Sequence, residues 1–317
     1  MAVPAGESSP AGPLIATGTQ IPERKRGFMV KQKSKWKSFL IIVGMLAPAL
    51  IVALGIVIYP IINTVIKSFQ DPSTGAFTLA NYSYLFTNKL AKAHIWYTIW
   101  VTSLTMILAI VFSYLLALYL RFSESRIAGI IRSLYLLPRF IPVLVAVYAL
   151  KMIIGDSGLI NRLSLLLPEG SPLYNLKPGL LYNAKGIILA NLWFNIPFAT
   201  MIISAALSGI SSSIVESAQD VGAGKLRIFF KMILPLSISD VMIAATFVFM
   251  SNVSSFTTPY LIGANHPMML GVYLRKQFSS RKYELAAAIS CLIFLFSSIS
   301  AIVYIYTNLK EKAWEKD

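Results

Sequence analysis

The stretch Ile95–Leu120, IWYTIWVTSLTMILAIVFSYLLALYL, contains no Asp, Glu, Lys or Arg. At about 1.5 Å of rise per residue, a helix over this stretch is longer than the roughly 30 Å of hydrocarbon in a bilayer. Its backbone hydrogen bonds would all be satisfied within the helix, as lipid requires. The stretch therefore predicts a transmembrane helix.

Further apolar stretches extend this pattern along the chain. Four are also free of charged residues: Ser38–Ile66, Gly186–Val215, Val241–Leu274 and Leu285–Leu309. A sixth, Ser133–Ile154, contains Arg139, Lys151 and two prolines. We expect it to form a spanning helix with one polar side facing the protein interior. The sequence thus predicts an all-α, polytopic membrane protein with six transmembrane helices.

Composition excludes the main alternatives. Of the 317 residues, 56% are hydrophobic and 13% charged, against roughly 25% charged in soluble domains. The lone Cys291 cannot form an intrachain disulfide. The net charge of +15 could suit nucleic acid, but no soluble basic domain is present to carry it. We expect these charges to face anionic lipid headgroups, with no nucleic acid partner.

The distribution of Lys and Arg predicts the orientation. One side of the membrane would hold the segment before the first span and those after the second, fourth and sixth spans. Lys and Arg are more numerous in these segments than in the loops on the opposite side. Insertion favours positive charge in cytoplasmic segments, so we expect both termini in the cytoplasm. The loop after the fifth span opposes this bias, although the spacing of Tyr273, Leu274 and Phe278 also suits a short helix lying on the membrane interface.

The loop after the fourth span has a pattern that a simple connector does not need. Residues 216–235 read ESAQDVGAGKLRIFFKMILP. After the N-capping hydroxyls of residues 211–213, a short helix could begin near Glu216 and be ended by Gly222 and Gly224. Apolar residues at near-helical spacing then predict a second short helix, which we expect Pro235 to stop before the fifth span. Two short helices would lie across the inner face of the membrane.

This loop resembles the signature of the permease family of type I ATP-binding-cassette importers. In that signature Glu-Ala-Ala is followed after three residues by Gly, and after nine more by Ile, one residue and Leu-Pro. The matching positions here are Glu216, Ser217, Ala218, Gly222, Met232, Leu234 and Pro235. Ser217 replaces the second position and Met232 replaces the Ile. The loop also falls between the fourth and fifth of six spans, where the family has it.

The resemblance covers about residues 38–309 and implies a transport subunit in a bacterial or archaeal plasma membrane. The domain 38–309, with its coupling loop 211–236, would lie between a mobile basic tail, 1–37, and a C-terminal tail, 310–317. The implied partners are a second permease, identical or homologous, two ATPase subunits, an extracytoplasmic solute-binding protein and the bilayer. The short helices would dock on an ATPase. ATP and Mg²⁺ would bind to those partners, and this chain would bind no cofactor.

Several absences favour a transport subunit over an enzyme. Gly224-Lys225 is followed by Leu226, which does not fit a phosphate-binding GxxxxGK[ST] loop. His94 and His266 have no partners at metal-ligand spacing, so we expect them to be solvated in loops. One alternative is a loop anchored to lipid by its Lys and Arg residues. Another is a secondary transporter or channel without ATPases, for which we see no intramembrane acids or inverted repeats.

The sequence does not identify the transported solute. Short segments resemble the polyamine, ferric iron, sulfate and phosphonate branch, although sugar importers share several of them. Polar residues near mid-membrane are candidates for the substrate path: Arg139, Lys151, Asn191, Asn195, Asn252, Ser254, Ser255 and Thr258. Arg139 and Lys151 favour an anionic cargo or a neutral, hydroxyl-rich one. Snorkelling of both cations, and helix packing by the serines, are the alternatives.

Overall fold

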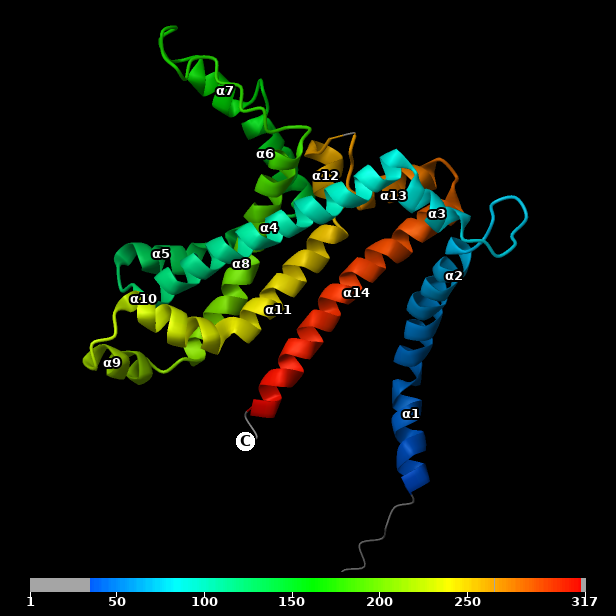
Figure 1. The fold of residues 1–317 in the computed structure, drawn as a ribbon, viewed down its shortest axis with the longest axis horizontal. Helices are drawn as coiled ribbons and strands as arrows, with labels where there is room; N and C mark the ends of the chain where they lie inside the picture. The colour runs from blue at the N-terminus through cyan, green and yellow to red at the C-terminus, as the bar shows by residue number, and fades with distance from the viewer. Residues whose placement is uncertain (1–34, 265, 315–317) are drawn as a thin grey trace, which may run out of the picture. The chain divides into compact units, whose positions relative to one another are not determined.

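A computed structural model describes residues 35–264 and 266–314, and helices dominate them (Figure 1). The elements in chain order are α1 Lys35–Val52, η1 Ala53–Ile58, α2 Tyr59–Ser68, α3 Ala80–Thr87, α4 Lys89–Phe122, α5 Arg126–Leu134, η2 Leu137–Phe140, α6 Val143–Ile154, α7 Leu159–Ser164, α8 Ala184–Gly209, α9 Ser212–Asp220, α10 Lys225–Ile228, η3 Phe229–Ile233, α11 Leu234–Val253, α12 Thr257–Ile262, α13 Leu270–Ser279 and α14 Tyr283–Trp314. Within these residues, β structure is limited to one isolated bridge between Gln70 and Phe77.

Six segments of the described chain are long and apolar enough to cross a membrane. They are Phe39–Ser68, Lys89–Phe122, Val143–Ser164, Ala184–Gly209, Lys225–Val253 and Tyr283–Tyr306. The predicted all-α, six-span fold is therefore confirmed. The expected basic tail, residues 1–37, falls outside the described residues except for the start of α1, and α14 continues through residues 310–314.

The chain divides into two compact units, Met1–Ile56 and Val57–Asp317. The described part of the first unit is α1 and the beginning of η1, a π-helical segment. Pro48 lies inside α1, where its missing N–H removes one helical hydrogen bond. The first unit therefore supplies a single apolar helix.

In the second unit, small residues on α4 allow α8 to pack closely along it. Ala109, Ser113 and Ala117 recur every four residues on one face of α4 and are fully buried. The Ser113 hydroxyl donates to the carbonyl of Ile196, 2.9 Å away on α8. Helices in lipid associate through such close packing of small residues. α11 packs against both helices, and α14 packs against α11 and α2.

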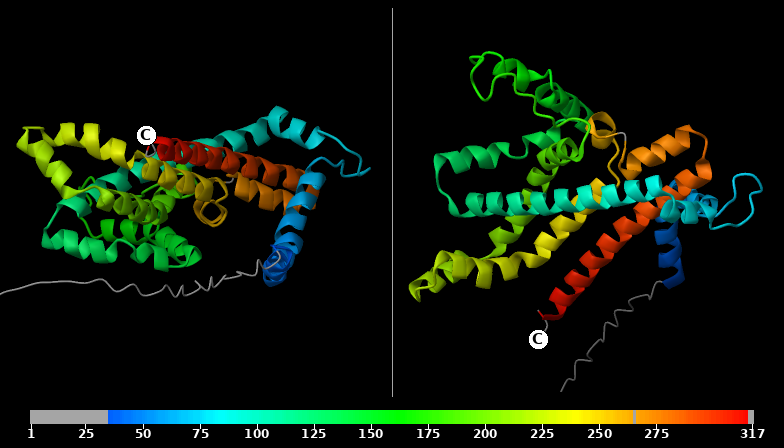
Figure 2. Two further views of the ribbon diagram at one scale, coloured as in Figure 1. Left: turned by 90° about the horizontal axis from the view of Figure 1, so that it is seen from below. Right: turned by 45° about the horizontal axis from the view of Figure 1, so that its top comes forward.

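The short helices gather at opposite ends of this bundle. In Figures 1 and 2, α9 and α10 lie at one end of α8 and α11, while α12 and α13 lie at the other. At the second end, buried Leu85, Leu270 and Ile289 belong to a core shared by α3, α13 and α14. The predicted short helix around Tyr273 is present as α13.

The third crossing is not the continuous helix that was expected over Ser133–Ile154. α5 ends at Leu134, a short 3₁₀ turn follows, and α6 begins only at Val143. Pro138 and Pro142 explain the break, because neither has an N–H to continue the helical ladder. α6 alone spans about 18 Å, less than the hydrocarbon core, and the candidate span Val143–Ser164 includes α7 as well.

Two further boundaries differ from the prediction. The helix expected to run to Val215 ends at Gly209, and a separate helix, α9, begins at Ser212. The crossing expected at Val241–Leu274 instead occupies Lys225–Val253. After Val253 the chain turns and forms α12 and α13 as separate helices. A run of uncharged residues shows that a segment can lie in lipid, but it does not show where a helix ends. The predicted boundaries were wrong for this reason.

Candidate functional site

The segment between α8 and α11 contains α9, whose end is shaped by Gly222. The N–H of Ala223 donates to the carbonyl of Ala218 at 3.0 Å, and the N–H of Gly222 donates to the carbonyl of Gln219 at 2.8 Å. This pair of bonds is a Schellman motif with Gly222 at its left-handed position, φ 81°. A Cβ there would meet no atom within 4 Å. Within this chain, the backbone angle rather than close approach requires the glycine.

The start of α9 is held by Arg121, at the end of α4. Its Nε donates to the carbonyl of Leu207 at 3.3 Å, and its Nη2 donates to the carbonyl of Ile210 at 3.2 Å. The same Nη2 donates to the Ser212 hydroxyl at 3.1 Å. The guanidinium thus neutralises the negative C-terminal end of α8 and fixes the turn into α9.

The expected serine N-cap of α9 does not form. Ser211 occupies the N-cap position, but its side chain makes no capping bond. Its hydroxyl is instead 2.6 Å from the Ser213 hydroxyl. The contact from Ser212 to Arg121 replaces local capping by a tertiary interaction.

A turn at residues 221–224 joins α9 to an unbroken helical run that continues into the bundle. α10, the π-helical η3 and α11 follow one another without a gap from Lys225 to Val253. The expectation that Pro235 ends a separate helix is wrong. Pro235 lies in the first turn of α11, directly after the π turn, so its missing N–H is tolerated. Ser237 on α11 then bonds the Tyr114 hydroxyl of α4 at 2.7 Å.

The outer surface of this segment combines polar and apolar side chains. Glu216 and Ser217 are exposed, whereas Ala218 packs against the core of α4, α8 and α11. Val221 is 84% exposed and Leu226 is 75% exposed. Exposed apolar side chains next to hydrogen-bonding groups are typical of surfaces that bind another protein.

Two amide side chains predicted for the substrate path meet between α8 and α11. Asn195 and Asn252 are both buried. The Ser251 hydroxyl donates to Oδ1 of Asn195 at 3.4 Å, and Nδ2 of Asn252 is 3.5 Å from that hydroxyl. Nδ2 of Asn191, one turn away on α8, is buried without a hydrogen-bond partner among the described residues. The two helices therefore share a polar patch in an otherwise apolar interface.

Arg139 reaches the same side of α8 from the break before α6. Its guanidinium carbon lies 4.8 Å from the centre of the Phe198 ring, a cation–π geometry. The Phe198 ring in turn meets the Phe247 ring of α11 edge to face, with centroids 6.2 Å apart. Sequence reasoning missed Phe198 and Phe247, because nothing distinguishes them from lipid-facing aromatic residues until Arg139 is placed.

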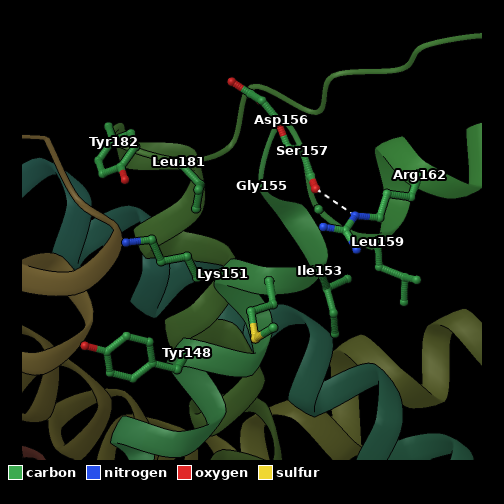
Figure 3. A pocket seen from close by; sticks show the side chains of 12 residues that line it. Tyr148, Lys151, Ile153, Gly155, Asp156, Ser157, Leu159, Arg162, Leu181 and Tyr182 are labelled. Atoms are coloured by element: carbon green, nitrogen blue, oxygen red, sulfur yellow. Dashed lines mark hydrogen bonds between the residues drawn. The ribbon is translucent and has the colours of Figure 1, made fainter. Parts of the chain in front are cut away.

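Lys151 lies elsewhere, in the last turn of α6. Its Nζ is 5.6 Å from the centre of the Tyr182 ring. Figure 3 shows both side chains at an open hollow of about 770 Å³, whose lining also includes Asp156 and Arg162. Asp156 accepts a hydrogen bond from the N–H of Gly179 at 3.2 Å. Lys151 and Arg139 therefore do not form one cationic site.

The remaining path candidates follow α11. Ser255 lies in the turn after α11, where its N–H donates to the carbonyl of Asn252 at 3.1 Å. Thr258 is buried in α12, and Ser254 is exposed at the end of α11. Gly271 fits closely here, since a Cβ would come 2.5 Å from the carbonyl oxygen of Ser255. These residues lie where the chain passes from α11 through α12 to α13.

The expectation for His94 is wrong. It is not solvated but buried on α4, where its Nδ1 accepts the N–H of Met268 at 3.0 Å. Its ring lies 4.6 Å from the Tyr273 ring and 6.0 Å from the His266 ring, measured between centroids. In the described residues, no group of three or more His, Cys, Asp or Glu side chains could hold a metal ion. His94 serves to join α4 to the loop before α13.

The fold and this site define a class: a six-span helical membrane protein with an exposed elbow, formed by α9 and α10, where the chain enters its fifth span. The description "binding-protein-dependent transport system inner membrane component" matches residues 109–315. The chain therefore belongs to this family, and it is a permease subunit of an ATP-binding-cassette importer.

Individual relatives agree with this assignment. The chain is 22% identical to the spermidine/putrescine transport system permease protein PotB of Haemophilus influenzae, over 73% of this chain and 79% of that protein. It is 25% identical to the probable sulfate transport system permease protein cysT of a Helicosporidium species, over 69% and 78%. Its fold matches a bacterial alginate ABC transporter in complex with an alginate-pentasaccharide-bound periplasmic protein, with TM-score 0.71, 17% identity, and coverage of 86% and 94%.

Proposed function

We propose that residues 211–236 are the site at which a separate ATPase subunit drives this permease. The observation that carries the proposal is the exposed elbow formed by α9 and α10. Val221 and Leu226 present apolar surface at its tip, and Glu216 presents a carboxylate. The match of this segment to the family signature supports the same role.

The connections of the elbow supply a route for movement. A displacement of α9 would act on α8 and α4 through Arg121. It would also act on α11 through the hydrogen-bonded turn at Gly222, because the helical run that follows from Lys225 to Val253 has no break. Edge-to-face contact between Phe229 and Tyr114, with centroids 5.7 Å apart, adds a second link to α4. Motion at the elbow would thus reorient the helices that carry the polar patch.

The whole transporter would contain more than this chain. We propose a second permease subunit, identical or homologous, two ATPases that bind ATP and Mg²⁺, and an extracytoplasmic solute-binding protein. The periplasmic protein in the matched alginate transporter supports a binding-protein partner. Both termini and the elbow would be cytoplasmic, as the Lys and Arg distribution indicates. Cargo would cross between the two permeases, and ATP would be hydrolysed on the partners.

The cargo is proposed to be neutral or anionic. The names of the relatives do not decide this, because spermidine is a cation and sulfate an anion. Arg139 next to Phe198, with the amide of Asn195 one turn away, supports recognition of carboxylate, sulfate or hydroxyl groups. If Arg139→Gln leaves uptake of such a cargo unchanged, or if spermidine competes for uptake, this assignment is wrong.

The ATPase site can be tested by placing a charge on its exposed tip. Val221→Asp should prevent the ATPase from co-purifying with the tagged chain, because an unpaired carboxylate would be buried in the joint. Leu166→Asp is the matched control, since Leu166 is 80% exposed in the connection between α7 and α8. Unchanged recovery of the ATPase with Val221→Asp, measured by mass spectrometry of the purified complex, would contradict the proposal.

A further inference from the structure

A polar cavity separate from the polar patch lies between the end of α4, the region of α5 and α8, where Arg121 in its lining also contacts Ser212 at the start of α9. Its volume is about 330 Å³, within the range of small-ligand sites. The polar residues of its lining are Arg121, Arg132, Tyr135, Ser204 and Ser208. No carboxylate belongs to this lining, so its formal charge is +2.

The two arginines keep donors available for a ligand. Arg121 uses its Nε and Nη2 on carbonyls at the end of α8 and on Ser212. Arg132 uses its Nη2 on the carbonyl of Leu120. A guanidinium has five N–H groups. Nη1 of Arg121, and Nε and Nη1 of Arg132, have no hydrogen-bond partner among the described residues.

The neutral polar groups of the cavity also favour a ligand that accepts hydrogen bonds. Oγ of Ser204 is buried and has no hydrogen-bond partner among the described residues. Ser208 uses its own hydroxyl as a donor to the carbonyl of Ser204 at 2.8 Å. Burial raises the pKa of Tyr135, so its phenol keeps its proton and can donate. A ligand that accepts several hydrogen bonds and carries negative charge would satisfy these groups together.

We propose that this cavity binds a phosphate group. Arginine pairs recognise phosphate oxygens through parallel N–H donors, and basic pockets between transmembrane helices suit phospholipid headgroups. The surroundings suit a lipid as the source, because Ile130 and Leu134 on α5 are exposed apolar side chains that acyl chains could cover. A free phosphate group would offer the same oxygens. The proposal does not depend on which partner drives the elbow.

The test compares three probes on the purified full chain: phosphatidylglycerol, diacylglycerol with the same acyl chains, and inorganic phosphate. Native mass spectrometry should show phosphatidylglycerol retained over diacylglycerol. Arg132→Gln should reduce this retention on the order of tenfold, the effect of losing one or two charge-assisted hydrogen bonds. Arg126→Gln, which removes the same charge from the first residue of α5 outside the cavity lining, should leave retention unchanged.

Ser204→Asp is the second variant and keeps the test decisive if Arg132→Gln fails to fold. Its carboxylate would occupy the cavity and should abolish retention. Displacement of phosphatidylglycerol by millimolar inorganic phosphate would support a phosphate site open to soluble anions, whereas retention without such competition would support a lipid headgroup. Equal retention of diacylglycerol, or equal losses in Arg126→Gln and Arg132→Gln, would overturn the proposal.

Discussion

Gly222 shows how one residue type can be required by backbone geometry alone. Its φ of 81° lies in the left-handed region, and there is open space around its Cα. Sequence spacing predicted both that a short helix ends here and that the position matters for coupling. The structure gives a reason for the first, and the second stays a prediction.

Gly222→Ala should weaken uptake while the chain still inserts in the membrane. A side chain in the left-handed region costs roughly 1–2 kcal/mol, which the end of α9 would relieve by shifting. Gly224→Ala is the control, because Gly224 also has open space but an ordinary φ of −68°. Uptake into vesicles containing the complete transporter, normalised to inserted chain, measures the effect. Equal uptake by the two variants would show that the conformation of this turn is unimportant.

Arg121 is the residue whose role sequence reasoning missed. In the sequence it is one of the Lys and Arg residues after the second span, whose distribution predicts the orientation. Its actual partners, at Leu207 and Ile210, lie 86 and 89 residues away. Local spacing carries no information about such contacts, which is why the anchoring of α9 was wrongly assigned to serine caps.

Arg121→Gln should loosen α9 from α8. Loss of the charge-assisted bonds to two carbonyls is expected to destabilise the junction by about 1–3 kcal/mol. Protease cleavage between residues 209 and 224 in detergent should therefore become faster, while Arg126→Gln should leave it unchanged. An unaltered cleavage rate in Arg121→Gln would mean that the core contacts of Val215 and Ala218 hold α9 without the arginine.

At the scale of elements, uncharged length predicted the number of spans but not their ends. The breaks at residues 135–142 and 254–256 depend on prolines and on packing of the following short helices. Pro235 was misjudged because a π turn precedes it and makes its missing N–H harmless. The polar patch was partly foreseen, since Asn195 and Asn252 were candidates. Their link through Ser251 depends on how α8 meets α11.

The α4–α8 contact makes a prediction at this scale. Ala109→Leu should separate the two helices, because Ala109 is fully buried and overpacking costs about 1–3 kcal/mol. Val111→Leu is the control on the same helix, where the side chain is exposed. A lowered melting temperature of the purified chain for Ala109→Leu alone is expected. Equal melting temperatures would show that this contact is not tightly packed.

At the scale of the whole molecule, the two ends of the bundle have different proposed tasks. The elbow end holds α9, Arg121 and the exposed Val221, and would meet the ATPase. The other end holds α12, α13 and the hollow beside Lys151. The polar patch at Asn195 and Ser251 lies on helices that connect the two ends. Such an arrangement allows a movement at one end to change access at the other.

Site-specific crosslinking tests this division most directly. In a Cys291→Ser background, which removes the chain's one cysteine, Val221→Cys should crosslink to the ATPase subunit in the assembled transporter and resist membrane-impermeant thiol reagents added outside cells. Leu166→Cys should not crosslink to the ATPase subunit and should react with the thiol reagents added outside cells. External labelling of Val221→Cys, or its failure to crosslink to the ATPase while Leu166→Cys succeeds, would contradict the central claim that the elbow binds the ATPase subunit.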